Sequence, residues 1–281
     1  MDKTKKNIYI IASISLVLIA VAVYFLFIFQ KAPKEIETDE GSSFVENIEK
    51  IDVANRPFVT LTPTADGAEI IISIENASYF DRIEYELTYQ ADNPQIAGEK
   101  IQRGSVETDV DTSQEKYKKS LLLGTASRGV RSPDTGITDG QLALHLFKGD
   151  TEYLSETKWD RFEIGTSGGE IFDSTGNFSL KVPRLSKDHW VIIADTVCIP
   201  PNAQVSPSDV LLPVYGTFSV APEFTTSASL SIKLTGDVKS PKLYTYSNQD
   251  SSWQSSESAF EGGALTAEVD SFGIFVIVSP K

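Results

Sequence analysis

The pattern of hydrophobic and polar positions changes sharply after the first thirty residues. From Ile8 to Phe29 no residue is charged and almost all are apolar. As a helix, this run of about 22 residues extends roughly 33 Å, enough to cross a hydrocarbon core of ~30 Å. The pattern therefore predicts a transmembrane helix over residues 8–29.

Flanking charges predict how this helix is oriented. Lys3, Lys5 and Lys6 precede it, and the positive-inside rule then places residues 1–7 in the cytoplasm and the rest of the chain outside. The alternative is a cleaved signal peptide. Such a peptide has a shorter apolar core and a cleavage site with small residues, which Gln30–Lys34 does not offer. We expect an uncleaved anchor.

Residues 30–56 form a predicted acidic tether between the anchor and the rest of the chain. Within it, Ser43 and Glu46 have the spacing of a helix capping box, and Phe44, Ile48 and Ile51 would share one helical face. The pattern predicts a short helix whose apolar stripe docks on the domain that follows rather than on lipid.

After Pro57 the hydrophobic period becomes two. Large apolar residues recur at every second position over Ile70–Ile74, Ile83–Tyr89 and Leu142–Leu146, and turn residues separate these runs. Alternation with such punctuation is typical of antiparallel strands with one buried face. We predict a β-sandwich over residues 57–165.

A second unit with the same period follows the flexible run Gly165–Gly169, which is the predicted domain boundary. Alternation returns at Phe178–Val182, Leu230–Leu234 and Leu265–Val269. By contrast, Phe272–Val278 is apolar at almost every position, which predicts a central strand covered on both faces. The fold class expected is mainly β, with two tandem antiparallel β-sandwiches, the second over residues 166–281.

The second unit resembles a ZU5-type β-sandwich. The resemblance lies in the order of Gly176–Pro183, Cys198–Ala203, Gly216–Pro222, the hairpin around Leu243–Tyr246 with Trp253, and the closing strand Val269–Val276. It implies a fold used for protein–protein contact. Some relatives cleave themselves at His-Phe-Ser, but Ser271, Phe272 and Gly273 stand at those positions here, so self-cleavage is not expected.

The first unit, with Leu121–Thr125 and Asp139–Gly140, resembles an Ig-like domain. Such pairs behind an N-terminal anchor are similar to surface proteins of bacteria with small genomes.

The overall charge narrows the class of partner. The chain has 25 basic and 39 acidic residues, a net charge of −14. Such a chain is repelled by phosphate backbones, so no nucleic-acid partner is expected. Cations or basic proteins are the partners that this charge favours.

Cys198 is the only cysteine in the sequence, so an intrachain disulfide is impossible. His189 and Asp195 lie near it in the sequence, as a Cys–His–Asp nucleophile would require. However, Trp190–Thr196 reads as a strand, and an extended chain would hold His189 and Cys198 roughly 30 Å apart. We interpret Cys198 as a buried structural thiol.

One acidic loop has the alternating oxygen ligands of a calcium site, in Asp109, Asp111, Ser113 and Glu115. An EF-hand loop also needs glycine at its sixth position and glutamate at its twelfth, where this chain has Gln114 and Ser120. We expect a solvated acidic loop without metal, and no other metal or cofactor site.

Trp253 stands in a serine-rich run, Asn248–Ser258, that reads as a loop. It is either an inward-packing side chain or an exposed anchor for a partner. Because exposed anchors usually occur in clusters, we predict that it packs inward against Leu243, Leu265 and Val269 of the second unit.

These patterns predict a non-catalytic, single-pass membrane protein that displays two extracytoplasmic β-sandwiches for contact with a protein or envelope partner. Two alternatives remain open. One is an envelope enzyme that uses Cys198, and the other is an accessory subunit that docks through the anchor 8–29 itself.

Overall fold

A computed structural model describes residues 44–183, 189–196, 198–200, 203–221, 224–236, 238–247 and 250–279. The predicted transmembrane helix 8–29 and most of the tether lie outside these residues. Within them, no helix has the length and apolar character needed to cross a membrane. The described part is mainly β, as predicted, with several antiparallel sheets.

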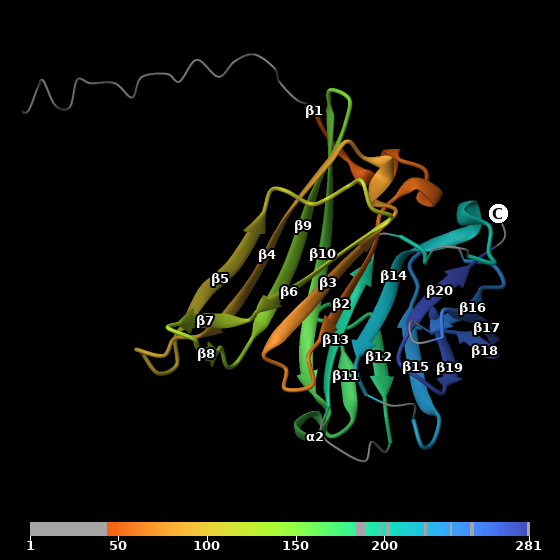
Figure 1. The fold of residues 1–281 in the computed structure, drawn as a ribbon. Coiled ribbons are helices and arrows are strands. Elements are labelled where there is room, and N and C mark those ends of the chain that lie inside the picture. The colour runs from red at the N-terminus through yellow and green to blue at the C-terminus, as the bar shows by residue number, and fades with distance from the viewer. Residues whose placement is uncertain are drawn as a thin grey trace, which may run out of the picture. The chain divides into compact units, whose positions relative to one another are not determined.

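A ten-stranded sheet runs through the molecule in the order β17-β16-β20-β14-β13-β10-β9-β4-β5 (Figure 1). Its tenth strand, β1, lies parallel beside β10, and every other pair is antiparallel. We call this the long sheet. Its strands are β1 (Phe44–Asn47), β4 (Arg82–Asp92), β5 (Lys100–Glu107), β9 (Thr138–Lys148), β10 (Thr151–Glu163), β13 (Trp190–Thr196), β14 (Val210–Ser219), β16 (Lys242–Ser247), β17 (Ser252–Ser256) and β20 (Ile274–Val278).

Two smaller sheets and a hairpin complete the β structure. The three-stranded sheet has β2 (Phe58–Pro63), β3 (Glu69–Glu75) and β6 (Lys116–Leu122). The five-stranded sheet has β11 (Glu170–Phe172), β12 (Phe178–Lys181), β15 (Ala228–Lys233), β18 (Ser258–Glu261) and β19 (Ala264–Val269). The hairpin is β7 (Gly124–Ser127) with β8 (Val130–Pro133). The helical turns are η1 (Ile48–Lys50), η2 (Val53–Asn55), η3 (Ala77–Tyr79), η4 (Pro207–Asp209) and α2 (Ile164–Ser167).

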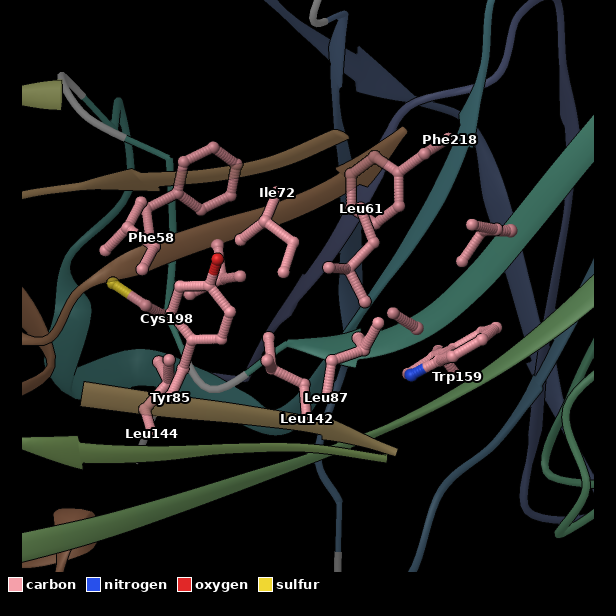
Figure 2. Packing of buried hydrophobic residues seen from close by; sticks show 14 of the residues in the cluster. Phe58, Leu61, Ile72, Tyr85, Leu87, Leu142, Leu144, Trp159, Cys198 and Phe218 are labelled. Carbon is pink, nitrogen blue, oxygen red and sulfur yellow. The ribbon is translucent and has the colours of Figure 1, made fainter. Parts of the chain in front are cut away.

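Two hydrophobic cores form where the smaller sheets cover the long sheet. The first core joins side chains of β2 and β3 to those of β4, β9 and β10, and Figure 2 shows members such as Leu61, Ile72, Leu87 and Trp159. The second core joins the five-stranded sheet to the long sheet. Burial of apolar surface at about 25 cal/mol per Å² makes these cores the main source of stability.

The central strands of the long sheet contribute to both cores. In β13, Ile192 belongs to the first core and Ile193 to the second. In β20, Val276 belongs to the first core and Phe275 to the second. All five residues of β20 are buried, which confirms the prediction of a central strand covered on both faces.

Strands from both predicted sandwiches share the long sheet. The predicted boundary, Gly165–Gly169, coincides with α2, but β10 before it pairs directly with β13 after it. The chain from Phe44 onward forms one compact unit. The division into separate domains 57–165 and 166–281 stays a prediction, and the structure adds that they are joined by continuous strand pairing.

The prediction of a short helix around residues 43–51 is wrong. Phe44–Asn47 is instead the strand β1, and only Ile48–Lys50 forms a turn of 3₁₀ helix, whose first turn the Asn47 side chain caps. Pairing with β10 satisfies the backbone of β1, which outweighs a weak helical preference. The expected docking is confirmed for Ile48 and Ile51, which are buried in the first core.

The prediction of a loop over Asn248–Ser258 is also wrong, because Ser252–Ser256 forms strand β17 at the edge of the long sheet. Trp253 pairs with Tyr246 of β16, with ring centroids 5.2 Å apart, and packs against the first core. Its predicted neighbour Leu243 lies in the second core. Side chains alternate between the faces of a strand, and Leu243 is three residues from Tyr246, the register partner of Trp253, so Leu243 and Trp253 lie on opposite sides of the sheet.

Candidate binding groove

The surroundings of Cys198 do not form a nucleophilic site. Its thiol is 1% exposed, lies in the first core (Figure 2) and donates a hydrogen bond to the carbonyl oxygen of Arg56 at 3.1 Å. Burial raises the pKa of the thiol to about 12. His189 precedes β13 and Cys198 follows it, so a strand of roughly 20 Å separates them.

The predicted calcium loop connects β5 to β6. Asp111 Oδ1 accepts hydrogen bonds from the amide of Ser113 at 2.9 Å and from its hydroxyl at 2.6 Å, and the bond from the Ser113 hydroxyl lowers the pKa of Asp111. Asp111 Oδ1 is thus already held by a residue of the same loop. Across the residues that the structure describes, no group of three His, Cys, Asp or Glu is arranged to hold a metal.

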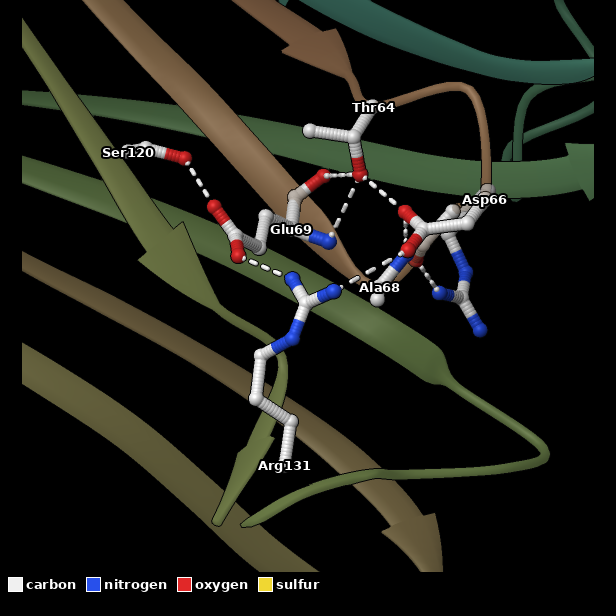
Figure 3. A network of polar contacts seen from close by, with 8 residues as sticks. Thr64, Asp66, Ala68, Glu69, Ser120 and Arg131 are labelled. Carbon is white, nitrogen blue, oxygen red and sulfur yellow. Dashed lines mark hydrogen bonds and ion pairs between the residues drawn. The ribbon is translucent and has the colours of Figure 1, made fainter. Parts of the chain in front are cut away.

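Two other polar clusters have structural explanations. His145 Nδ1 lies 2.6 Å from Glu152 Oε1 across the β9–β10 pair. Figure 3 shows Arg131 joined to Glu69 and Asp66, which ties the β2–β3 turn to β8. Exposed ion pairs of this kind contribute little to stability or binding.

A groove opens where the long sheet is interrupted beside β10. One edge of β10 pairs with β1 over Thr151–Leu154 and with β13 over Trp159–Glu163. On this edge, no strand in the described ranges is paired with residues 155–158, and Asp195 of β13 contacts Lys158 through its side chain. The cavity there has a volume of about 550 Å³. We call it the β1 groove, and it is lined by Val45, Glu46, Asn47, Ile48, Glu49, Arg56, Leu154, Glu156, Asp195, Leu212 and Pro213.

The local sequence explains why pairing stops here. Asp195 is near the end of β13, and its Oδ1 accepts the amide hydrogen of Lys158 at 2.6 Å, in place of a strand partner. On the other wall, the pairing of β14 with β20 shifts register between Leu211 and Tyr215. A break of this kind re-aims side chains, and Leu212 is 43% exposed.

Among the described residues that line the β1 groove, Arg56 is the only cation. Only 4% of it is exposed. Its Nε donates to the carbonyl oxygen of Ile51 and its Nη2 to that of Glu49, both at 2.9 Å. Its Nη1 is buried and has no hydrogen-bond partner in the described part of the chain. Burial lowers the pKa of Arg56, but a guanidinium remains charged at neutral pH.

Carboxylates dominate the rest of the polar lining. Burial raises the pKa of Asp195 to about 6, although the hydrogen bond from the Lys158 amide favours the ionised form. Glu46 forms an ion pair with Lys50 at 2.9 Å. Among the described residues, Asp195, Glu156 and Glu49 form no ion pair with another side chain. The groove therefore has excess negative charge.

Apolar side chains border these charges. Val45 is 59% exposed and Leu212 43% exposed, and Leu154 and Pro213 lie beside them. A concave site with apolar walls and a few charged groups suits ligand binding. No pattern in the sequence indicates this site, because its residues come from four distant segments and Arg56 marks only the end of the tether in the sequence pattern.

Comparison with known proteins assigns no family. No family model matches this chain, and no curated protein matches it. The resemblance to ZU5-type and Ig-like sandwiches stays a prediction.

The raised pKa of Asp195 predicts a pH-dependent effect of Asp195→Asn on stability. The folded state holds the Asp195 proton more tightly than the unfolded state, whose pKa is near 3.8. The wild type therefore loses stability as pH rises from about 4 to about 6, by at most ~3 kcal/mol from this group. Asp195→Asn removes that loss. The stability of the variant relative to the wild type therefore increases from pH 4 to pH 6 and stays at the higher value above pH 6.

Urea unfolding of both proteins at several pH values measures this difference. Other carboxylates titrate in both proteins and cancel in the comparison. A stability difference that stays constant from pH 4 to pH 8 would contradict the assignment of a buried, ionisable Asp195.

Proposed function

We propose that this protein is a non-catalytic binding module, anchored in the membrane by residues 8–29 and displayed outside the cell, which binds a protein partner through the β1 groove. The observation that carries the proposal is the groove itself. It combines exposed Val45 and Leu212 with the buried, incompletely hydrogen-bonded Arg56 at a break in a sheet.

The scaffold supports this proposal because it holds the groove rigidly. β10 is paired on its other edge with β9 over Thr151–Trp159, and β13 is packed on both faces. Rigid strands position binding residues more accurately than loops do. The expected pair of sandwiches, Ig-like and ZU5-like, agrees with a role in protein–protein contact.

The alternative of an enzyme that uses Cys198 has weaker support. A thiol with a pKa near 12 is a poor nucleophile, and at 1% exposure it is closed to substrate. The alternative of an accessory subunit depends on the anchor. Replacing residues 8–29 with an unrelated apolar helix distinguishes it, because a simple tether tolerates the exchange.

Protease treatment of spheroplasts tests the proposed location. We expect added protease to digest residues 44–281 without lysis, because the positive-inside rule places them outside. A cytoplasmic protein serves as the intactness control. Full protection until the membrane is broken would contradict this topology.

Site-specific crosslinking in intact cells tests the groove. A photo-reactive amino acid at Leu212, beside the groove, should give a discrete adduct with a partner protein. The matched position is Val130, which is 70% exposed on β8 and does not line the groove. Adducts of the same size and yield at both positions, or none at Leu212, would contradict the proposal.

A further inference from the structure

We propose that two copies of this chain associate through β17, whose free edges pair antiparallel and join the two long sheets into one. The occupant of this edge is therefore a second copy of the same chain. No residue of β17 lines the β1 groove, so the inference goes beyond the proposed function and does not depend on it.

β17 is a terminal strand of the long sheet with an open outer edge. In the described part of the chain it pairs only with β16, and no other backbone–backbone hydrogen bond reaches residues 252–256. Gln254 and Ser255 are exposed, and the other three residues of the strand are half-buried. A strand in this position presents a row of unpaired N–H and C=O groups, which is a template for another strand.

The other strand edges of the three sheets are protected against such pairing. β2 is buried at every position except Thr62. The remaining edge strands carry charged side chains, a natural device against edge-to-edge association; these are Glu46 in β1, Lys100, Arg103 and Glu107 in β5, Lys116, Lys118 and Lys119 in β6, Glu170 in β11 and Glu261 in β18. By contrast with these described strands, β17 reads Ser-Trp-Gln-Ser-Ser, with no charge, no proline and no bulge in its pairing with β16.

The sequence of β17 is complementary to itself when two copies run antiparallel about Gln254. In that register Gln254 faces its own copy, and each of the two amides can donate and accept a hydrogen bond. The large Trp253 comes opposite the small Ser255 of the second copy, and Ser252 comes opposite Ser256. The pairing has two-fold symmetry, the commonest symmetry of protein oligomers.

The charges around β17 also suit this register. Each chain has a net charge of −14, so two copies repel each other wherever their carboxylates meet. The charged residues nearest to β17 in the sequence are Asp250 and Glu257. In the register about Gln254 they come level with Ser258 and Ser251 of the second copy, so neither carboxylate lies opposite another.

Disulfide crosslinking of the full-length protein in detergent micelles tests this register. Residues opposite each other in antiparallel strands have Cα atoms about 4.5–5.5 Å apart, within the ~4.4–6.8 Å that a disulfide spans. Gln254→Cys should therefore give a disulfide-linked dimer on oxidation. Cys198 does not react, because it is 1% exposed. The matched control is Gln102→Cys, since Gln102 is exposed on β5, the strand at the other end of the long sheet.

Charge variants test the same contact by sedimentation velocity in density-matched detergent. Five residues per copy make a smaller interface than the standard size, so we expect a reversible dimer with a dissociation constant in the micromolar range. Gln254→Lys sets two ammonium groups opposite each other and should weaken the dimer roughly tenfold. Gln254→Glu should act likewise, and an equimolar mixture of the two variants should restore the dimer, which misfolded variants could not do. Gln102→Lys should leave the dimer unchanged.

Equal disulfide yields from Gln254→Cys and Gln102→Cys, or sedimentation as a monomer up to about 300 μM, would overturn the inference. So would a mixture of charge variants that fails to restore the dimer. A dimer that Gln254→Lys does not weaken would place the contact elsewhere in the chain, which also contradicts it. Crosslinking at Leu212 tests the β1 groove separately, so failure here leaves the proposed function standing.

Discussion

The rest of this structure depends on burial of the central strands of the long sheet on both faces. β13 and β20 alternate between two cores, so every residue of β20 is buried although consecutive side chains point in opposite directions. A strand in this position needs an apolar run rather than an alternating one. Both cores include side chains from these strands, in addition to those of the smaller sheet that covers each face.

This constraint also creates the β1 groove. β10 belongs to the part of the long sheet under the first core, and its far end joins β13. The first residues of β10 pair with β1, a parallel strand of four residues. β1 and β13 lie along the same edge of β10 without contacting the same residues. Arg56 and Cys198 meet just behind this break, where the chain leaves η2 for β2. The groove is thus a consequence of how the two halves of the chain are joined.

Much of the secondary structure could be predicted from the sequence because its cause is local. The alternation at Ile70–Ile74 and Ile83–Tyr89 is the direct sign of strands with one buried face, and β3 and β4 lie there. The pairing of β10 with β13 could not be predicted, since a glycine-rich joint reads equally well as a domain boundary. β1 could not be predicted because it is short and its partner β10 is distant in sequence, and β17 could not because its serine-rich run has no apolar alternation, although it pairs with the preceding strand β16.

The candidate site was beyond prediction for the same reason. Cys198, Trp253 and the Asp109–Glu115 loop attract attention as residue types, whereas Arg56 and Asp195 gain their properties only from burial. Glu156 and Leu212 look like ordinary members of a strand. Neither the charge pattern nor the spacing in the sequence indicates that the four segments of the β1 groove lie together.

Hydrogen exchange of the full-length protein tests most directly whether the two cores unfold together because they share the long sheet. Ile193→Ala removes a side chain that lies only in the second core, at a cost of about 2–5 kcal/mol. If the long sheet unfolds as one unit, the slowest amides of β3, in the first core, should exchange faster by the same factor as those of β15, in the second. Faster exchange in β15 with no change in β3 would contradict the account.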